Sequence, residues 1–198
     1  MPDDDRTPPT KIRITGLQEV QLERLARIAQ ECAAMLLAAG VAPERVSPLD
    51  YRGIAKLHRD HDLHVAEADN AVAGYLAWRD EQPKVGVVAI LNVSPEYQRF
   101  GVGTRLLRAM AESCADKEID HVVARCFDDA SFAVAFLKRA GFAPAVAGAE
   151  LPQAVREWQD RRAAAGELAT AGETLYWRQR DELGVQVLPG IPRPADAG

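Results

Sequence analysis

Residues Gln98–Gly103, with the sequence QRFGVG, are a candidate site for binding phosphate groups. They follow an apolar stretch, Val85–Val93, and precede apolar residues at helical spacing, which predicts a turn between a strand and a helix. The first backbone N–H groups of a helix have no partner within it, and the helix dipole adds partial positive charge there. Gly101 and Gly103 lack side chains that would keep a ligand away. We therefore expect an anion site at this turn.

Three phosphate-binding patterns can be compared with this turn. A P-loop needs a lysine followed by serine or threonine after its last glycine, and that lysine is missing. A dinucleotide turn of the form GxGxxG needs a third glycine where Leu106 stands, and it does not follow a meander of strands. The remaining pattern is Q/R-x-x-G-x-G after a buried strand, and QRFGVG matches it.

The segment LNVSPEYQRFGVGTRLL, Leu91–Leu107, resembles the acetyl-CoA-binding motif of the GCN5-related N-acetyltransferase (GNAT) family, L-x-V-x-P-x-x-Q/R-x-x-G-x-G-x-x-L-L. The later segment FAVAFLKRAGF, Phe132–Phe142, is similar to the family's second signature. The order of expected elements over residues 12–179 also fits the family. The resemblance implies an acyl-CoA, most simply acetyl-CoA, as co-substrate, and no metal.

The resemblance also implies which residues hold the coenzyme. Backbone groups of Leu91–Val93 would pair with pantetheine, on a strand that splays away from its neighbour. Backbone amides of Arg99–Thr104 would hold the pyrophosphate. The expected cofactor-binding residues are thus Leu91, Asn92, Val93, Gln98, Arg99, Phe100, Gly101, Val102, Gly103 and Thr104.

The chain departs from the family at the positions that usually carry acid–base chemistry. Many relatives have acidic residues just before L-x-V, where this chain has Ala89 and Ile90. A tyrosine that serves as general acid in many relatives is replaced by Leu137, and a cofactor-holding asparagine by Ala130. These departures put the usual acid and base in doubt and leave the cofactor motif intact.

Three other residues are candidates for catalysis. Asn92 could donate a hydrogen bond to the reacting carbonyl, or it could simply face a helix. Tyr97 lies in the loop before the glycines, where packing is the alternative role. Cys126 ends the next strand; it could take part in covalent transfer or be a buried small hydrophobe.

Two functions follow from these residues. The first is an acyl-CoA-dependent N-acyltransferase that acts on an amine of a small molecule or peptide by direct attack. The second is an acyl-CoA-binding or partner-binding module, or an enzyme of other chemistry, that has lost the usual acid and base. In the family the acceptor lies between the first helices and the loop before the last strand, here roughly Ala33–Pro48 and Ala145–Gly172, which we expect to form a partial lid.

His58, His61 and His64 recur at a spacing of three residues. On one helix they would share a face and could hold a metal. The segment crosses an expected boundary between a helix and a strand, which breaks that face. We therefore expect a solvated turn and no metal site.

These residues need a scaffold of alternating strands and helices. Expected strands are 11–17, 63–68, 71–79, 85–93, 120–127, 173–179 and a short one at Phe142. Expected helices cover 18–39, 48–58, 103–117, 128–140 and 151–164. A meander followed by βαβ order predicts an α/β (α+β) fold with a mixed, mostly antiparallel sheet of about seven strands and helices on both faces. We expect one domain over residues 11–180, a disordered leader over 1–10 and a tail over 181–198.

Composition narrows the partners. The 198-residue chain has a net charge of −5, which argues against nucleic acid. No apolar run approaches 18 residues, so we expect no membrane span. Three widely spaced cysteines suit a reducing cytoplasm. Residues 151–166 predict a surface helix with Val155 and Trp158 turned inward, or alternatively a homodimer contact.

Overall fold

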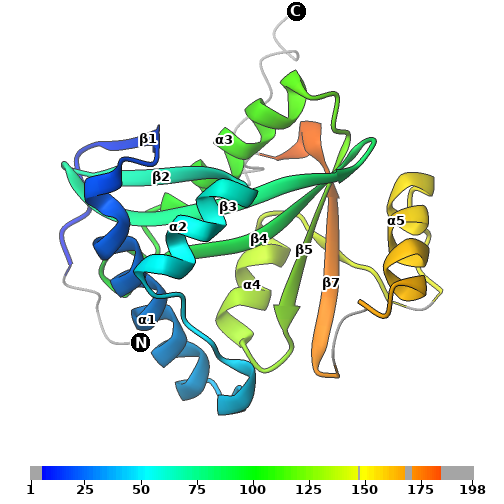
Figure 1. Cartoon of the computed structure of the whole chain (residues 1–198), viewed down its shortest axis with the longest axis horizontal. Coiled ribbons are helices and arrows are strands. Elements are labelled where there is room, and N and C mark those ends of the chain that lie inside the picture. Colours follow the sequence, from blue (N-terminus) through cyan, green and yellow to red (C-terminus); the bar gives the residue numbers. More distant parts are fainter. Residues whose placement is uncertain (1–5, 147, 168–170, 184–198) are drawn as a thin grey trace, which may run out of the picture.

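A seven-stranded mixed sheet organises the part of the chain that the computed structural model describes, residues 6–146, 148–167 and 171–183 (Figure 1). Its strand order is β1-β2-β3-β4-β5-β7-β6, and only the β4–β5 pair is parallel. The strands are β1 (Ile12–Gly16), β2 (Asp62–Ala68), β3 (Ala71–Gln82), β4 (Val85–Val93), β5 (His121–Phe127), β6 (Ala143–Pro144) and β7 (Glu173–Gln179). The helices are α1 (Leu22–Ala38), α2 (Tyr51–Asp60), α3 (Val102–Asp116), α4 (Ser131–Arg139) and α5 (Gln153–Ala164). The predicted fold class is confirmed.

Helices cover both faces of the sheet, because the strands alternate apolar side chains between the two sides. Tyr75 and Ala77 of β3 pack under α1 and α2, whereas Leu76 and Trp78 pack under α3. Tyr75 and Trp78 therefore lie on opposite faces, as the alternation of side chains along a strand requires. The helix α5 packs beside the α1–α2 layer, on the C-terminal strands.

The apolar stretch Val85–Val93 forms the central strand β4, but only its first residues are buried. Val85 and Gly86 are buried, whereas Ala89 is exposed and Ile90–Val93 are half-buried. The reason is that β5 pairs with β4 only over Val85–Val88 and then diverges from it. The splayed strand pair that the resemblance implied is present.

The helix expected from Pro48 begins three residues later, at Tyr51. The side chain of Asp50 accepts a hydrogen bond from the N–H of Gly53 at 2.7 Å, which caps the first turn. Residues 6–10 of the predicted leader have no helix or strand, and 1–5 lie outside the described residues, as do 184–198 of the predicted tail. No helix in the described part of the chain is long and apolar enough to cross a membrane.

The helix α5 is fixed to the sheet by two buried side chains and one carboxylate. Val155 and Trp158 face inward, as predicted, and are at most 4 % exposed. Glu81 on β3 accepts hydrogen bonds from Trp158 Nε1 at 2.9 Å and from Arg162 Nη1 at 2.9 Å. Arg79 Nη2 adds a third contact to this carboxylate at 2.5 Å. A homodimer contact through this helix stays a prediction.

Replacing Glu81 by alanine is expected to lower the free energy of unfolding by about 2 kcal/mol, because Trp158 Nε1 and two guanidinium groups lose their acceptor. Burial raises the pKa of Glu81, but hydrogen bonds from Arg79 and Trp158 and the charge of Arg162 outweigh it, so the pKa lies below its ordinary value. The contribution of ionised Glu81 to the free energy of unfolding is therefore complete above about pH 5, and it is lost as pH falls below about 4.

Urea unfolding at pH 7 and at pH 3.5 measures this contribution. The matched control is Glu157→Ala, which removes an exposed carboxylate from α5 itself. We expect the control to change stability by less than about 0.5 kcal/mol. A Glu81→Ala loss that is as large at pH 3.5 as at pH 7 would contradict the ionic origin of the effect.

Candidate active site

A β-bulge at Ala89 divides β4 into two halves. In the pairing with β3, Trp78 lies opposite Val88 and Ala77 lies opposite Ile90. Ala89 is therefore an extra residue that pairs with no residue of β3. An extra residue in one strand reverses the alternation of side chains beyond it. The bulge therefore decides which side chains of β4 face each layer of helices.

Beyond the bulge, β4 presents different chemistry on its two faces. Ile90 joins the apolar cluster under α1 and α2, and Asn92 takes the same face, where it contacts Tyr75. Leu91 and Val93 pack on the opposite face, against the cluster under α3. In the half of β4 that no longer pairs with β5, the only polar side chain is therefore Asn92, on the face covered by α1 and α2.

The backbone groups of β4 also alternate in direction. The N–H of Ser94 donates to the carbonyl of Ala73 on β3 at 2.9 Å. By alternation the peptide groups of Leu91 and Val93 face the other way, towards the side from which β5 has diverged. The Gln98 side chain occupies one position there, since its Nε2 donates to the carbonyl of Val93 at 3.0 Å. Leu91 and Val93 therefore offer backbone groups to a ligand, whereas the Asn92 peptide faces β3.

The turn into α3 carries a row of unpaired N–H groups. Arg99 and Gly101 have positive φ values of 72° and 80°, and α3 begins at Val102. Among the described residues, no acceptor faces the backbone amides of 99–104. A Cβ atom added at Gly101 would meet nothing within 4 Å. Successive amides around a left-handed residue at a helix start form a concave site for anions.

The two sequence signatures meet at Gly103. A Cβ atom built on Gly103 would lie 3.0 Å from the ring of Phe136 on α4. This distance is too short for a side chain at 103 without a shift of the ring. The glycine therefore allows α4 to pack against the first turn of α3.

The structure places Asn92 on the opposite face of the sheet from the other two predicted catalytic residues, Tyr97 and Cys126. Asn92 lies on the α1–α2 face, where its Nδ2 donates to the hydroxyl oxygen of the fully buried Tyr75 at 2.9 Å. Tyr97 is half-buried in the 3₁₀ turn Pro95–Tyr97 and packs against the cluster under α3. Cys126 belongs to that same cluster and is 8 % exposed.

The Cys126 thiol is poorly suited to covalent transfer. Burial raises its pKa to about 11, and the charges of Asp128 and Glu173 act in the same direction. The thiolate is the nucleophilic form of cysteine, and little of it exists near neutral pH at such a pKa. The predicted covalent role has no support from these surroundings, and the alternative of a buried hydrophobe fits them.

The apolar replacements Ala130 and Leu137 both lie in the core. Ala130 is fully buried and Leu137 on α4 is 7 % exposed, within the cluster under α3. Neither position can supply a proton to a reacting group. In the folded protein, position 137 is thus occupied by a buried core residue, and it offers no proton donor in place of the tyrosine that the resemblance led us to look for.

A polar network at the end of β4 was not predicted. Glu31 on α1 accepts hydrogen bonds from Ser94 Oγ at 2.6 Å and from Arg24 Nη1 at 2.7 Å. Burial raises the pKa of Glu31, but these two partners outweigh it and the pKa is lowered, so the carboxylate is ionised at neutral pH. The network ties α1 to the residue after Val93. Its only sequence signal is that Arg24 and Glu31, seven residues apart, share one face of α1.

The loop between α1 and α2 reaches across to the ends of β5 and β7. The Arg45 guanidinium lies 4.7 Å from the ring centroid of Phe127, and its Nη2 is 3.7 Å from an oxygen of Glu173. Arg45 lies in the first of the two segments expected to form a partial lid, and a Cβ atom built on Gly172, the last residue of the second, would lie 2.7 Å from Arg45 Nη1. The lid itself stays a prediction. A residue of the α1–α2 loop thus lies against the end of β5 and the start of β7.

The three histidines at three-residue spacing do not share a helix face. The helix α2 ends at Asp60 and β2 begins at Asp62, as the predicted boundary required. His64 lies on β2 and accepts a hydrogen bond from Trp78 Nε1 at 3.3 Å. Within the described ranges, no group of three or more His, Cys, Asp or Glu side chains is arranged to hold a metal ion.

Comparisons with known proteins agree with this geometry. Residues 22–142, more than half of the chain, match the acetyltransferase (GNAT) family. Similar solved structures include the PaiA N-acetyltransferase of Thermoplasma acidophilum in complex with coenzyme A (16% identity, TM-score 0.64, 86% of this chain and 99% of that chain covered). Ard1 of Thermoplasma volcanium is also similar (19% identity, TM-score 0.61, 85% of this chain and 97% of that chain covered). So is the ribosomal-protein-S18-alanine N-acetyltransferase of Escherichia coli (15% identity, TM-score 0.58, 85% of this chain and 94% of that chain covered). No curated protein matches the sequence.

Proposed function

Because the chain belongs to the GNAT family of acetyltransferases, we propose that it transfers an acyl group, most simply acetyl, from coenzyme A to an amine of a small molecule or peptide. The observation that carries this proposal is the row of amides at residues 99–104, for which the described part of the chain offers no acceptor, placed at the end of a strand from which its neighbour diverges. The donors suit a diphosphate, and the open backbone of β4 suits an extended amide-bearing arm.

Each part of the coenzyme has a counterpart in this proposal. Amides 99–104 and the α3 dipole bind the diphosphate, with Gly101 leaving room for it. Backbone groups of Leu91 and Val93 pair with pantetheine along the edge that faces the diverging strand. Gln98 supports this edge by holding the Val93 carbonyl.

The acceptor amine then approaches from the α1–α2 side, where Asn92 is the polar side chain of β4. Its attack forms a C–N bond, the C–S bond of the thioester breaks, and the amine proton passes to the leaving thiolate or to water. With its Nδ2 held by Tyr75, the Asn92 amide oxygen is directed away from that contact and can accept a hydrogen bond from the amine. Asn92 is thus an orienting group in this proposal, and no side chain acts as a strong base.

Asn92→Ala is expected to lower kcat about tenfold with little change in the KM for acetyl-CoA, because the amine loses its orienting partner. Tyr75→Phe keeps the amide but removes its anchor, so we expect a smaller fall in kcat. Steady-state kinetics with one acceptor measures both. A rise in the KM for acetyl-CoA with unchanged kcat would contradict an orienting role.

The alternative function is a module that binds an acyl-CoA without transferring its acyl group. The apolar residues Ala89, Ile90 and Leu137 favour it, together with the raised pKa of Cys126. The two functions share the cofactor site and differ only in turnover.

Calorimetry with coenzyme A and acetyl-CoA, followed by thiol release with a panel of amines, separates these functions. Binding together with thiol release above the rate of thioester hydrolysis supports transfer. Binding without amine-dependent release supports the module. No measurable association with coenzyme A at millimolar concentration would overturn both.

A further inference from the structure

The arginine of the N-terminal segment lies against the loop that precedes α3. The Arg6 guanidinium donates to the carbonyl of Pro95 and, at 3.5 Å, to that of Gln98. It also lies 5.4 Å from the centroid of the Phe100 ring. These partners belong to residues 95–100, which lead directly into the unpaired amides of the candidate diphosphate site.

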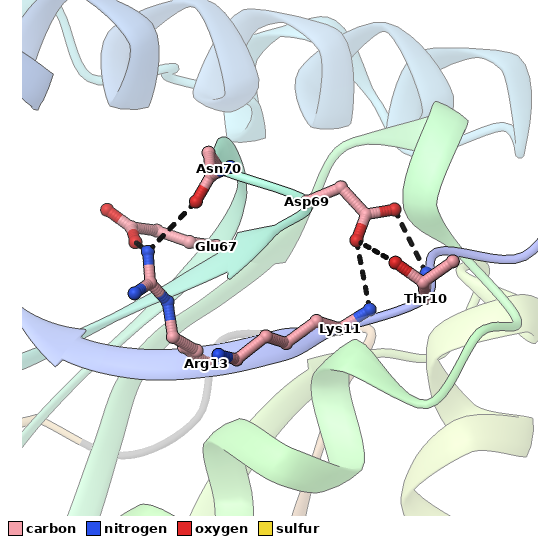
Figure 2. A pocket seen from close by; sticks show the side chains of 6 residues that line it. All are labelled: Thr10, Lys11, Arg13, Glu67, Asp69 and Asn70. Carbon is pink, nitrogen blue, oxygen red and sulfur yellow. Dashed lines mark hydrogen bonds and ion pairs between the residues drawn. The ribbon is translucent and has the colours of Figure 1, made fainter.

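The segment that carries Arg6 is anchored at its other end by Asp69, in the turn between β2 and β3 (Figure 2). The Asp69 carboxylate accepts hydrogen bonds from the Thr10 hydroxyl at 2.7 Å, from the Thr10 N–H at 3.0 Å and from the Lys11 N–H at 2.9 Å. The Asp69 N–H returns a bond to the Lys11 carbonyl at 2.9 Å. We call residues 6–11 the N-terminal strap.

Two prolines stiffen the N-terminal strap between its anchors. Pro8 and Pro9 each restrict φ to about −65°. A short segment with two fixed residues and one firmly bound end loses little further freedom when Arg6 docks. The anchoring by Asp69 therefore delivers the guanidinium to one place on the loop.

The loop itself has a backbone that needs support from its surroundings. Arg99 is not a glycine, yet its φ is +72°, and Gly101 follows with φ of +80°. Side-chain-bearing residues adopt such conformations at a cost in free energy and keep them only where neighbouring contacts hold the chain. Arg6 contacts the loop on both sides of Arg99, through the Gln98 carbonyl and the Phe100 ring.

We propose that Arg6 is a positioning residue for the coenzyme: the N-terminal strap holds residues 95–100 in the shape that aims amides 99–104 at the diphosphate. This inference rests on the proposed function, because it takes coenzyme A as the ligand of those amides. Arg6 acts through the loop rather than through the reacting atoms. Losing it weakens coenzyme binding and leaves the chemical step unchanged.

The test measures coenzyme A affinity by calorimetry and steady-state kinetics with acetyl-CoA. For Arg6→Ala we expect the Kd of coenzyme A and the KM of acetyl-CoA to rise together about fivefold to tenfold, with kcat unchanged. Arg6→Lys keeps the charge, but an ammonium cannot bond two carbonyls and stack on a ring as a planar guanidinium does. We therefore expect Arg6→Lys to bind coenzyme A nearly as weakly as Arg6→Ala does.

The matched control is Arg13→Ala, which removes the same charge from β1, where Arg13 bonds Glu67 and Asn70 (Figure 2). Its affinity for coenzyme A should equal that of the unchanged protein. Unchanged affinity in Arg6→Ala, or full recovery in Arg6→Lys, would overturn the positioning role. So would a fall in thermal stability without a change in Kd. If the unchanged protein does not bind coenzyme A, the proposed function fails instead.

Discussion

Replacing Gly101 by valine is expected to weaken coenzyme A binding at least about 100-fold while the protein still folds. The residue has a φ of +80°, and a Cβ atom there would meet nothing within 4 Å. The added side chain therefore finds room in the folded protein but occupies the space in front of the amides. Losing two charge-assisted hydrogen bonds at roughly 1.5 kcal/mol each accounts for an effect of this size. Calorimetry with coenzyme A measures it.

Backbone strain alone could also disturb binding, and a second glycine controls for it. Gly166, after the end of α5, has a φ of +72° and equally empty surroundings. Gly166→Val therefore carries a similar conformational cost at a place remote from α3. We expect the two variants to lose similar stability, in the range of 1–2 kcal/mol, and only Gly101→Val to lose affinity. Equal affinities in the two variants would exclude the loop as the diphosphate site.

The local parts of this site could be predicted from sequence because short-range chemistry determines them. The bounds of β4 and β7 follow from continuous or alternating β-formers flanked by turn residues, and the observed strands agree with those predicted. The glycine turn into α3 is equally local. The opposite facing of Tyr75 and Trp78 needed only the period of a strand.

The face taken by Asn92 could not be predicted, because it depends on the register with a second strand. Whether Asn92 serves the site or faces a helix was left open by the sequence. The bulge at Ala89 places it on the α1–α2 face, beside Tyr75. A bulge arises from pairing with β3, and nothing in the sequence of β4 alone marks it.

Contacts between distant segments were missed for a related reason. The acidic, proline-bearing N-terminus has the composition of a disordered leader, yet Arg6 contacts residues some 90 positions away. Ser94 and Glu31 are each ordinary in their own segments and form a pair only when α1 crosses the end of β4. Contacts of this kind between distant segments can be identified only when the fold is already known.

The pKa of the acceptor should control the rate of transfer more strongly than any side chain does. Burial raises the pKa of Cys126 and of Cys32 to about 11, so both thiols stay protonated between pH 7 and 9. Burial also raises the pKa of Tyr75. A group with a raised pKa can donate a proton in this range but cannot accept one, so these three residues supply no base. In the proposed mechanism the amine therefore arrives neutral.

At pH 7 an α-amine with a pKa near 8 is roughly one-tenth neutral, whereas a lysine side chain with a pKa near 10.4 is neutral to a few parts in ten thousand. These neutral fractions differ by about 200-fold. The higher intrinsic nucleophilicity of the more basic amine offsets part of this difference, so we expect kcat/KM for the α-amine to exceed that for the lysine amine by roughly tenfold. Two forms of one lysine-containing tripeptide, each with a different amine acetylated, make the comparison at equal size.

The pH profile tests the same mechanism independently. Without an enzyme base, log kcat/KM should rise with a slope of one up to the pKa of whichever amine is used, near 8 for the first peptide and above 10 for the second. A common inflection for both peptides, below either amine pKa, would mean that a side chain of the protein accepts the proton. A preference for the lysine amine at pH 7 would lead to the same conclusion, and the search for a base would then begin with Glu173 beside Arg45.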